Sequence, residues 1–214
     1  MTFLIVLLGW IFSLTLHEFS HALTAYFGGD YTVREKGYLT FNPLKYTHPV
    51  YSIVLPLVFL LLGGIGLPGG AVYIETWRLR SSKWVSAVSL AGPASNLFLA
   101  VLLGLLLNVL PANGGGVWPG LAFLALLQVT AALFNLLPVP PFDGYGALRP
   151  HLGVAWRERM DAFGQVSMWV VLAIFWYLPV IGGLFWRLVA VVAGFFGIPL
   201  DLAALGQSLF MFWR

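Results

Sequence analysis

Two histidines and a glutamate near the start of the chain have the types and spacing of a metal site. They lie in the run His17-Glu18-Phe19-Ser20-His21, inside an almost unbroken apolar stretch from Met1 to Phe27. If that stretch is helical, His17 and His21 lie on one face, one turn apart, where two imidazoles can bind one Zn²⁺. Glu18 is then positioned to take a proton from a water on the metal.

The setting of this pattern is more informative than the pattern itself. HExxH also occurs by chance in helices of soluble proteins, but an ionisable residue inside a membrane segment is costly and indicates function. The alternative is a set of polar side chains that are satisfied within a helix bundle and have no chemical role.

The composition indicates a polytopic helical membrane protein. Of 214 residues, 60% are hydrophobic and only 9% are charged, whereas a soluble domain carries about 25% charged residues. The net charge of +3 is spread over loops, as topology signals are, so it does not indicate nucleic-acid binding. The absence of cysteine excludes disulfides and thiolate metal sites.

The fold class expected is all-α, with about five to six transmembrane or re-entrant segments. Short membrane-associated strands are expected between the first and third spans, in residues 30–48 and 71–76, where apolar and polar residues alternate loosely. The apolar runs are residues 3–27, 50–67, 84–110, 120–137, 165–181 and 184–198. We expect a catalytic membrane core over residues 1–163 and C-terminal transmembrane helices over 164–214.

Basic residues predict the orientation of the spans. They fall in residues 34–45, 78–83 and 149–159, which the positive-inside rule places on the cytoplasmic face. Two of these segments flank residues 50–67, so that run cannot be a simple crossing. We expect it to re-enter, and its Pro and Gly residues are compatible with this. The charged stretch Arg157-Glu158-Arg159 is expected to be a solvated loop.

Asp143 is the best candidate for a third metal ligand. A site of two histidines needs one more protein ligand and an open position, and a carboxylate fits. Asp143 follows a Pro-rich turn just past the cytoplasmic end of the fourth span, at a depth similar to that of His21. The alternative is a simple turn residue in an Asp-Gly pair. His48 and His151 are either spare ligands or loop histidines without a metal role.

Three motifs in order resemble those of the site-2 protease family of intramembrane zinc metalloproteases. They are His17 to His21, then Ala91-Gly92-Pro93-Ala94-Ser95-Asn96, then Asn135 through Gly144. The chain resembles the compact bacterial branch, without an extra leading span and without a PDZ or nucleotide-sensing domain. It departs from the family pattern at Phe142, where Leu or Met is more usual, a hydrophobic exchange that leaves the catalytic residues unaffected.

The resemblance implies roles for specific residues. His17, His21 and Asp143 would bind one zinc ion per chain, and Glu18 would be the general base. Asn135 would help to hold the substrate backbone or the oxyanion. Asn96 is expected to assist at the same place, to support the site across a helix interface, or simply to bond a neighbouring helix.

The resemblance also implies a function and a location. The expected activity is a zinc metalloendopeptidase that cuts membrane proteins in or near their transmembrane segments. It would be a multi-pass protein of the cytoplasmic membrane, with its site near the cytoplasmic face. Its partners would be the lipid bilayer and a substrate with a transmembrane helix, and the oligomeric state stays open. A catalytically silent zinc-binding scaffold is the alternative. A transporter is disfavoured because the ionisable groups gather at one depth.

Overall fold

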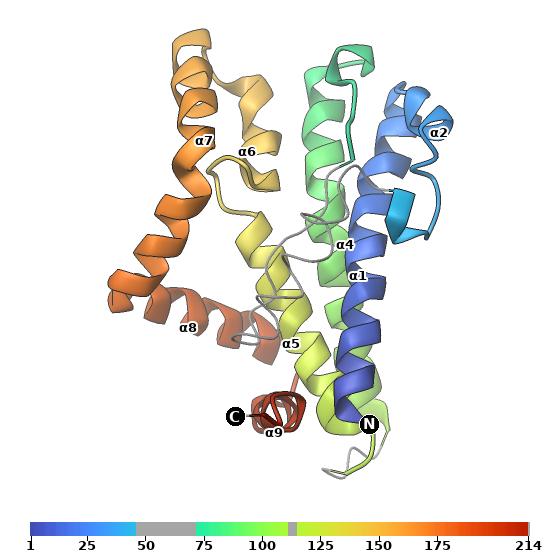
Figure 1. Ribbon diagram of the computed structural model, residues 1–214, viewed down its shortest axis with the longest axis vertical. Coiled ribbons are helices and arrows are strands. Elements are labelled where there is room, and N and C mark those ends of the chain that lie inside the picture. The colour runs from blue at the N-terminus through green and yellow to red at the C-terminus, as the bar shows by residue number, and fades with distance from the viewer. Residues whose placement is uncertain (46–71, 111–114, 214) are drawn as a thin grey trace.

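The computed structural model describes residues 1–45, 72–110 and 115–213, and within them the regular structure is helical. Figure 1 shows how the helices are arranged. In chain order the helices are α1 (Thr2–Gly28), α2 (Thr32–Glu35), η1 (Pro43–Lys45), η3 (Thr76–Arg78), α4 (Ser82–Val109), α5 (Trp118–Asn135), α6 (Asp143–Leu148), η4 (Arg149–His151), α7 (Val154–Tyr177), α8 (Pro179–Phe195) and α9 (Leu200–Phe210).

Four of these helices, α1, α4, α5 and α7, are long and apolar enough to cross a membrane. The pair α8 and α9, bent by 117°, makes a fifth span if it is taken as one broken span. The prediction of an all-α polytopic membrane protein is confirmed. Residues 50–67, expected to re-enter the membrane, lie outside the described residues.

Helices α1, α4 and α5 form the centre of the molecule, with α4 packed against both of the others. Large side chains of α1 and α5 interlock, among them Trp10, Phe123 and Leu127. Between apolar spans such packing works through close contact, because lipid already solvates apolar surface. The centre is therefore a close-packed bundle that can hold side chains at fixed positions.

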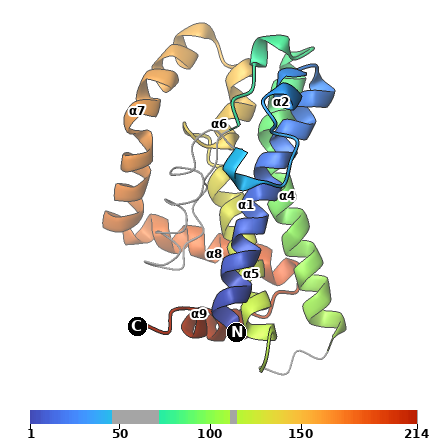
Figure 2. The same cartoon turned by 45° about the vertical axis from the view of Figure 1, so that its right-hand side comes forward.

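The C-terminal helices pack at the side and end of this centre, as Figures 1 and 2 show. Helix α7 packs on α8, and α9 crosses α5. A β-carbon at Gly206 would lie 1.9 Å from the carbonyl oxygen of Pro119, so the crossing needs glycine. Arg157, Glu158 and Arg159 lie within α7, which corrects the prediction of a loop there. Residues 163 and 164, where the expected catalytic core meets the expected C-terminal helices, both lie within α7, and that division stays a prediction.

The predicted strands are absent from the described residues. In residues 30–45 the chain forms α2 and η1 instead, and residues 72–75 are neither helix nor strand. Local contacts override the loose alternation of apolar and polar residues in 31–41. Gly29, with φ of 116°, caps α1, and the Asp30 carboxylate accepts hydrogen bonds from the backbone N–H and the hydroxyl of Thr32. Together they turn the chain directly into α2.

Most of the three basic segments lies at one end of the molecule, although residues 41–45 return along α1, where Phe41 stacks on Phe12 and Phe19. Figures 1 and 2 show α2, the start of α4, and the region joining α6 to α7 at the end opposite the N-terminus. The segments carry Arg34, Lys36 and Lys45, then Arg78, Arg80 and Lys83, then Arg149, Arg157 and Arg159. This grouping agrees with the expectation that all three face the same side of a membrane.

Candidate metal centre

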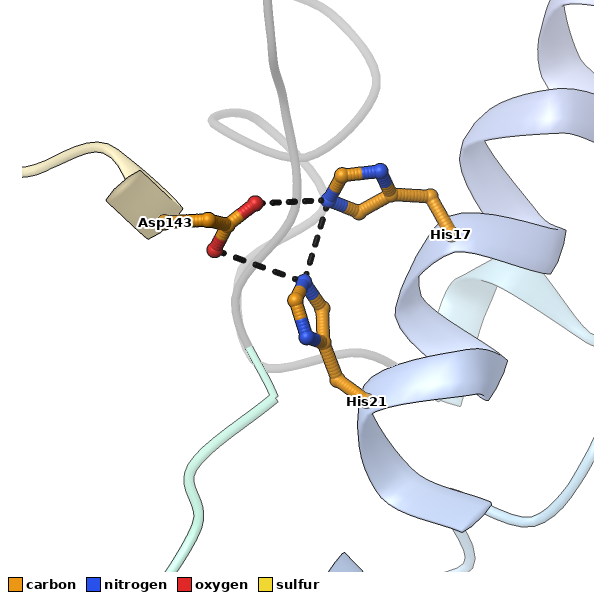
Figure 3. A group of neighbouring side chains, drawn as sticks. All are labelled: His17, His21 and Asp143. Atoms are coloured by element: carbon orange, nitrogen blue, oxygen red, sulfur yellow. Dashed lines mark hydrogen bonds and ion pairs between the residues drawn. The ribbon is translucent and has the colours of Figure 1, made fainter. Parts of the chain in front are cut away.

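Helix α1 presents both histidines of the first motif on its buried face. His17 and His21 are each 6% exposed, and their Nε2 atoms lie 3.0 Å apart. The spacing of four residues stacks the two side chains one turn apart. Figure 3 shows that both rings point away from the helix axis toward the same place.

Asp143 reaches that place from a different part of the chain. One carboxylate oxygen lies 3.2 Å from His17 Nε2 and the other 3.4 Å from His21 Nε2. Asp143 is the first residue of α6, which begins directly after the proline-rich turn at the end of α5. A β-carbon at Gly144 would lie 2.2 Å from the carbonyl oxygen of Leu136, so glycine lets α6 pack tightly on the end of α5. This contact fixes the position of Asp143.

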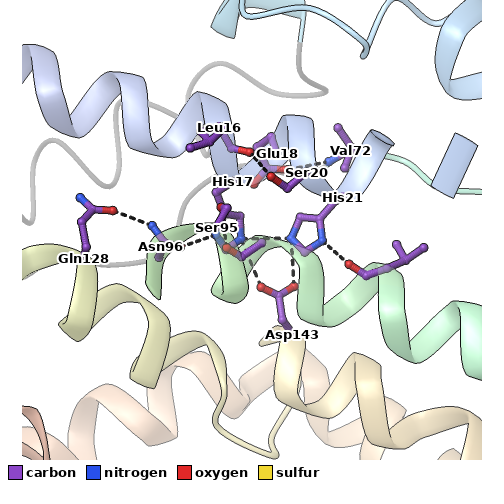
Figure 4. A network of polar contacts seen from close by, with 12 residues as sticks. Leu16, His17, Glu18, Ser20, His21, Val72, Ser95, Asn96, Gln128 and Asp143 are labelled. Carbon is purple, nitrogen blue, oxygen red and sulfur yellow. Dashed lines mark hydrogen bonds and ion pairs between the residues drawn. The ribbon is translucent and has the colours of Figure 1, made fainter. Parts of the chain in front are cut away.

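The remaining ring nitrogens of the two histidines are held by α4. His21 Nδ1 lies 2.7 Å from the carbonyl oxygen of Val88, and His17 Nδ1 lies 2.6 Å from Oδ1 of Asn96. Both oxygens can only accept, so both Nδ1 atoms donate, and each Nε2 keeps a lone pair. Figure 4 shows the two histidines held between these contacts and Asp143.

This arrangement fits a metal ion. Two imidazole lone pairs and a carboxylate face one another, with all three ligand atoms within 4.8 Å, and one Asp143 oxygen is buried without a hydrogen-bond partner in the described chain. Tetrahedral zinc with bonds of about 2.0–2.1 Å separates its ligand atoms by roughly 3.3–3.4 Å. The two Nε2 atoms lie 3.0 Å apart, and each lies 3.2–3.4 Å from a different oxygen of Asp143, so the three side chains are close enough to share one ion. Three protein ligands leave one position open, as in catalytic zinc sites.

Glu18 lies beside these ligands and is also buried, at 4% exposure. Its carboxylate accepts a hydrogen bond of 3.2 Å from the backbone N–H of Val72. The carboxylate therefore meets the backbone of the segment 72–75, which follows the undescribed residues 46–71.

The segment 72–75 is tethered to the end of α1 and to α2. The fully buried Asp30 accepts a hydrogen bond of 2.8 Å from the Glu75 N–H. Lys36 Nζ lies 2.9 Å from the Glu75 carboxylate and also donates to the carbonyl of Tyr73. Hydrogen bonds from Lys36 and Arg78 lower the pKa of Glu75 to about 2. These contacts hold the segment beside Glu18.

The other predicted site residues are placed differently. Asn135 is the last residue of α5 and is 5% exposed; its contact with substrate stays a prediction. His151 does not join the three ligands, because its Nε2 lies 2.9 Å from the Ser86 hydroxyl. His48 lies outside the described residues.

Sequence reasoning missed two residues that contact the site. Gln128, an amide in the middle of the apolar α5, accepts a hydrogen bond from Asn96, and its presence in a membrane span was a usable signal. Gly92 packs against both histidines; the small residues of its motif indicated a close approach of another helix, but not that the histidines would fill the contact.

The chain is similar to proteins named as zinc metalloproteases. It is 47% identical to the "Putative zinc metalloprotease Rip2" of Mycolicibacterium smegmatis, over 99% of this chain and 81% of that protein. It is 44% identical to the Mycobacterium tuberculosis protein of the same name, with the same coverage of both chains. The Bacillus subtilis "Putative zinc metalloprotease YwhC" is 33% identical over 82% of this chain and 80% of that protein.

No family profile matches the chain. No solved structure matches it either. Nearly full-length identity of 44–47%, together with the three ordered motifs and the geometry of His17, His21 and Asp143, shows that the chain belongs to the site-2 protease family of zinc metalloproteases.

Proposed function

We propose that this protein is an intramembrane zinc metalloendopeptidase that hydrolyses peptide bonds in or near the transmembrane segments of membrane proteins. One observation carries the proposal. Two histidines and a buried glutamate on α1, a helix long and apolar enough to span a membrane, converge with Asp143 at the start of the short helix α6.

His17, His21 and Asp143 would hold the zinc ion through the three atoms that face one another. When bound there, zinc supplies a Lewis acid that polarises a peptide carbonyl and lowers the pKa of water to about 7. Glu18 takes the proton from the attacking water and returns it to the leaving amine. Burial keeps bulk water away from these groups, which strengthens their electrostatic interactions.

The depth of the site supports a membrane substrate. His21 precedes the end of α1 by seven residues (28 − 21), which at 1.5 Å per residue is about 10 Å. The site is thus nearer the basic end of the bundle than the N-terminal end, inside a helix that covers the hydrocarbon thickness. A helical substrate hides its carbonyls in backbone hydrogen bonds, so it must unwind locally before attack.

The partners follow from this placement. The substrate would be a membrane protein with a transmembrane helix, and the surrounding solvent would be the lipid bilayer. With the basic segments on the inside, the protein would sit in the cytoplasmic membrane with its site near the cytoplasmic face. Asn135, at the end of α5, would hold the unwound backbone or the oxyanion.

The test combines zinc content with cleavage of a reporter transmembrane helix. The wild type should hold about one zinc per chain and cut the reporter in or near its membrane segment, as mass spectrometry of the products would show. His17→Ala should lose both zinc and cleavage. Glu18→Gln should keep zinc and lose cleavage by about 10²- to 10⁴-fold. Wild-type protein that holds zinc but cuts no helix would favour the silent scaffold.

The orientation can be tested directly because the chain has no cysteine. Glu35 and Gly115 are exposed and lie on opposite sides of the predicted membrane. In intact cells, a membrane-impermeant maleimide should label Gly115→Cys and spare Glu35→Cys. The reverse pattern would place the site at the outer face.

A further inference from the structure

A line of buried polar side chains connects three helices behind His17. Asn96 of α4 contacts His17 Nδ1 through its Oδ1 at 2.6 Å, and its Nδ2 donates to Oε1 of Gln128 on α5 at 2.8 Å. Figure 4 shows the line running from Gln128 through Asn96 to the ligand set. Asn96 is 3% exposed and Gln128 is fully buried.

The direction of each hydrogen bond decides what His17 can do. A neutral imidazole carries one N–H, and the proton leaves the other nitrogen with the lone pair. With Oδ1 of Asn96 toward the ring, Nδ1 carries the proton and Nε2 can bind a metal. With the amide reversed, its NH₂ would face Nδ1, the proton would move to Nε2, and no lone pair would point toward Asp143.

A hydrogen bond to Gln128 keeps the Asn96 amide in the orientation with Oδ1 toward His17. An isolated amide can bond a ring nitrogen with either end, so contact with His17 alone does not fix it. The Oε1 of Gln128 accepts from Nδ2 and thereby leaves Oδ1 for the histidine. A buried amide in an apolar span is costly unless it has such a partner.

We propose that Gln128 and Asn96 are positioning residues that hold His17 as the Nδ1–H tautomer and aim its Nε2 at the zinc. Both polar groups of Asn96 are engaged inside the protein, so we assign it this role in place of contact with substrate. His21 obtains the same tautomer from the backbone carbonyl of Val88. The proposal rests on the proposed zinc site, but its tests do not require cleavage.

Zinc affinity, measured by competition with a fluorescent chelator, gives the first test. Asn96→Leu removes the acceptor, and the affinity should fall by about 10- to 100-fold. Asn96→Asp keeps an acceptor toward Nδ1, and the affinity should stay within a fewfold of the wild type. Gln128→Leu should give an intermediate loss. Ser95→Ala is the matched control, because within the described residues the Ser95 hydroxyl donates to the Gly92 carbonyl of its own helix.

Nitrogen NMR of protein with ¹⁵N-labelled histidine gives the second test. In the zinc-loaded wild type, His17 should show a protonated Nδ1 and a metal-bound Nε2, and this signature should be lost in Asn96→Leu and kept in Asn96→Asp. A folded Asn96→Asp variant as weak as Asn96→Leu would mean that the amide only packs, and would overturn the proposal.

Two further outcomes separate this proposal from the function it rests on. Wild-type protein that binds no zinc would overturn both. Wild-type protein that binds zinc, with Asn96→Leu equal to it in affinity and in nitrogen spectrum, would overturn the positioning role and leave the proposed protease function standing.

Discussion

Gly92 of α4 lies directly against the imidazole of His17 on α1. A β-carbon at residue 92 would lie 2.4 Å from Nε2 of His17 and equally close to Nε2 of His21. Real β-carbons essentially never come so close to another atom, so any side chain here would push both rings out of place. The glycine thus gives α4 the close approach that brings Asn96 and the Val88 carbonyl within reach of the two histidines.

We therefore expect Gly92→Ala to lower zinc affinity by about tenfold or more. Such a loss would come from displaced ligands and not from a weaker helix, because alanine is more favourable than glycine in a helix interior by about 0.5–1 kcal/mol. Gly194→Ala in α8 is the matched control, since a β-carbon there meets nothing within 4 Å. Competition with a chelator measures the zinc affinity of both variants. Equal affinities would show that α4 can move to accommodate alanine without displacing the ligands.

The sequence was informative where chemistry and helix periodicity coincide. The i, i+4 spacing of His17 and His21 correctly placed both side chains on one face. Asp143 could be chosen from the turn after the fourth span because membrane topology limits which segments can meet. The structure brings these three residues together, although their roles as ligands remain predictions.

Other features depend on contacts between distant segments, which sequence patterns do not encode. Gln128 is visible in the sequence as an amide within an apolar span, but its partner Asn96 lies on another helix. In the described part of residues 30–48, the expected strands gave way to α2, because the Asp30 carboxylate accepts hydrogen bonds from Thr32. Helix α7 begins at Val154. Its first turns are charged, so the apolar run of residues 165–181 did not reveal where the helix starts.

Asp143 and His151 are rival candidates for the third ligand, and zinc content separates them. Asp143→Ala should leave the protein with much less than one zinc per chain, because two ligands bind the ion far more weakly than three. His151→Ala should keep full zinc, because its ring lies on Ser86 and away from the other ligands. Atomic emission on the purified variants gives the answer. Retained zinc in Asp143→Ala together with loss in His151→Ala would reverse the assignment.

Asp30 should control how firmly the segment 72–80 stays attached to α1. Asp30→Ala leaves the Glu75 N–H without its carboxylate partner, at a cost of about 1–3 kcal/mol. If trypsin acts on the detached segment, cleavage after Arg78 and Arg80 should become about 5- to 150-fold faster. Glu35→Ala, on the exposed face of α2, should not change the rate. Equal rates for both variants would show that other contacts suffice to hold the segment.

We propose that the backbone beside Glu18 receives an unwound substrate. The N–H groups of Val72 and Glu75 donate hydrogen bonds to the carboxylates of Glu18 and Asp30, and these bonds hold the segment between them in place. Tyr73 lies between these two anchors and is exposed. An extended peptide could add to this backbone as a strand adds to a sheet edge, although the described segment is not itself a strand.

Tyr73→Pro tests this hypothesis, because proline removes the N–H of residue 73 and leaves the N–H groups of Val72 and Glu75. We expect it to abolish cleavage of the reporter helix while zinc content stays at the wild-type level. Tyr73→Ala is the control: it also loses the contact between Lys36 and the tyrosine ring but keeps the backbone donor, so it should still cut the reporter. Cleavage by Tyr73→Pro at the rate of Tyr73→Ala would rule out strand addition at this segment. Loss of zinc in Tyr73→Pro would mean that the segment supports the metal site itself.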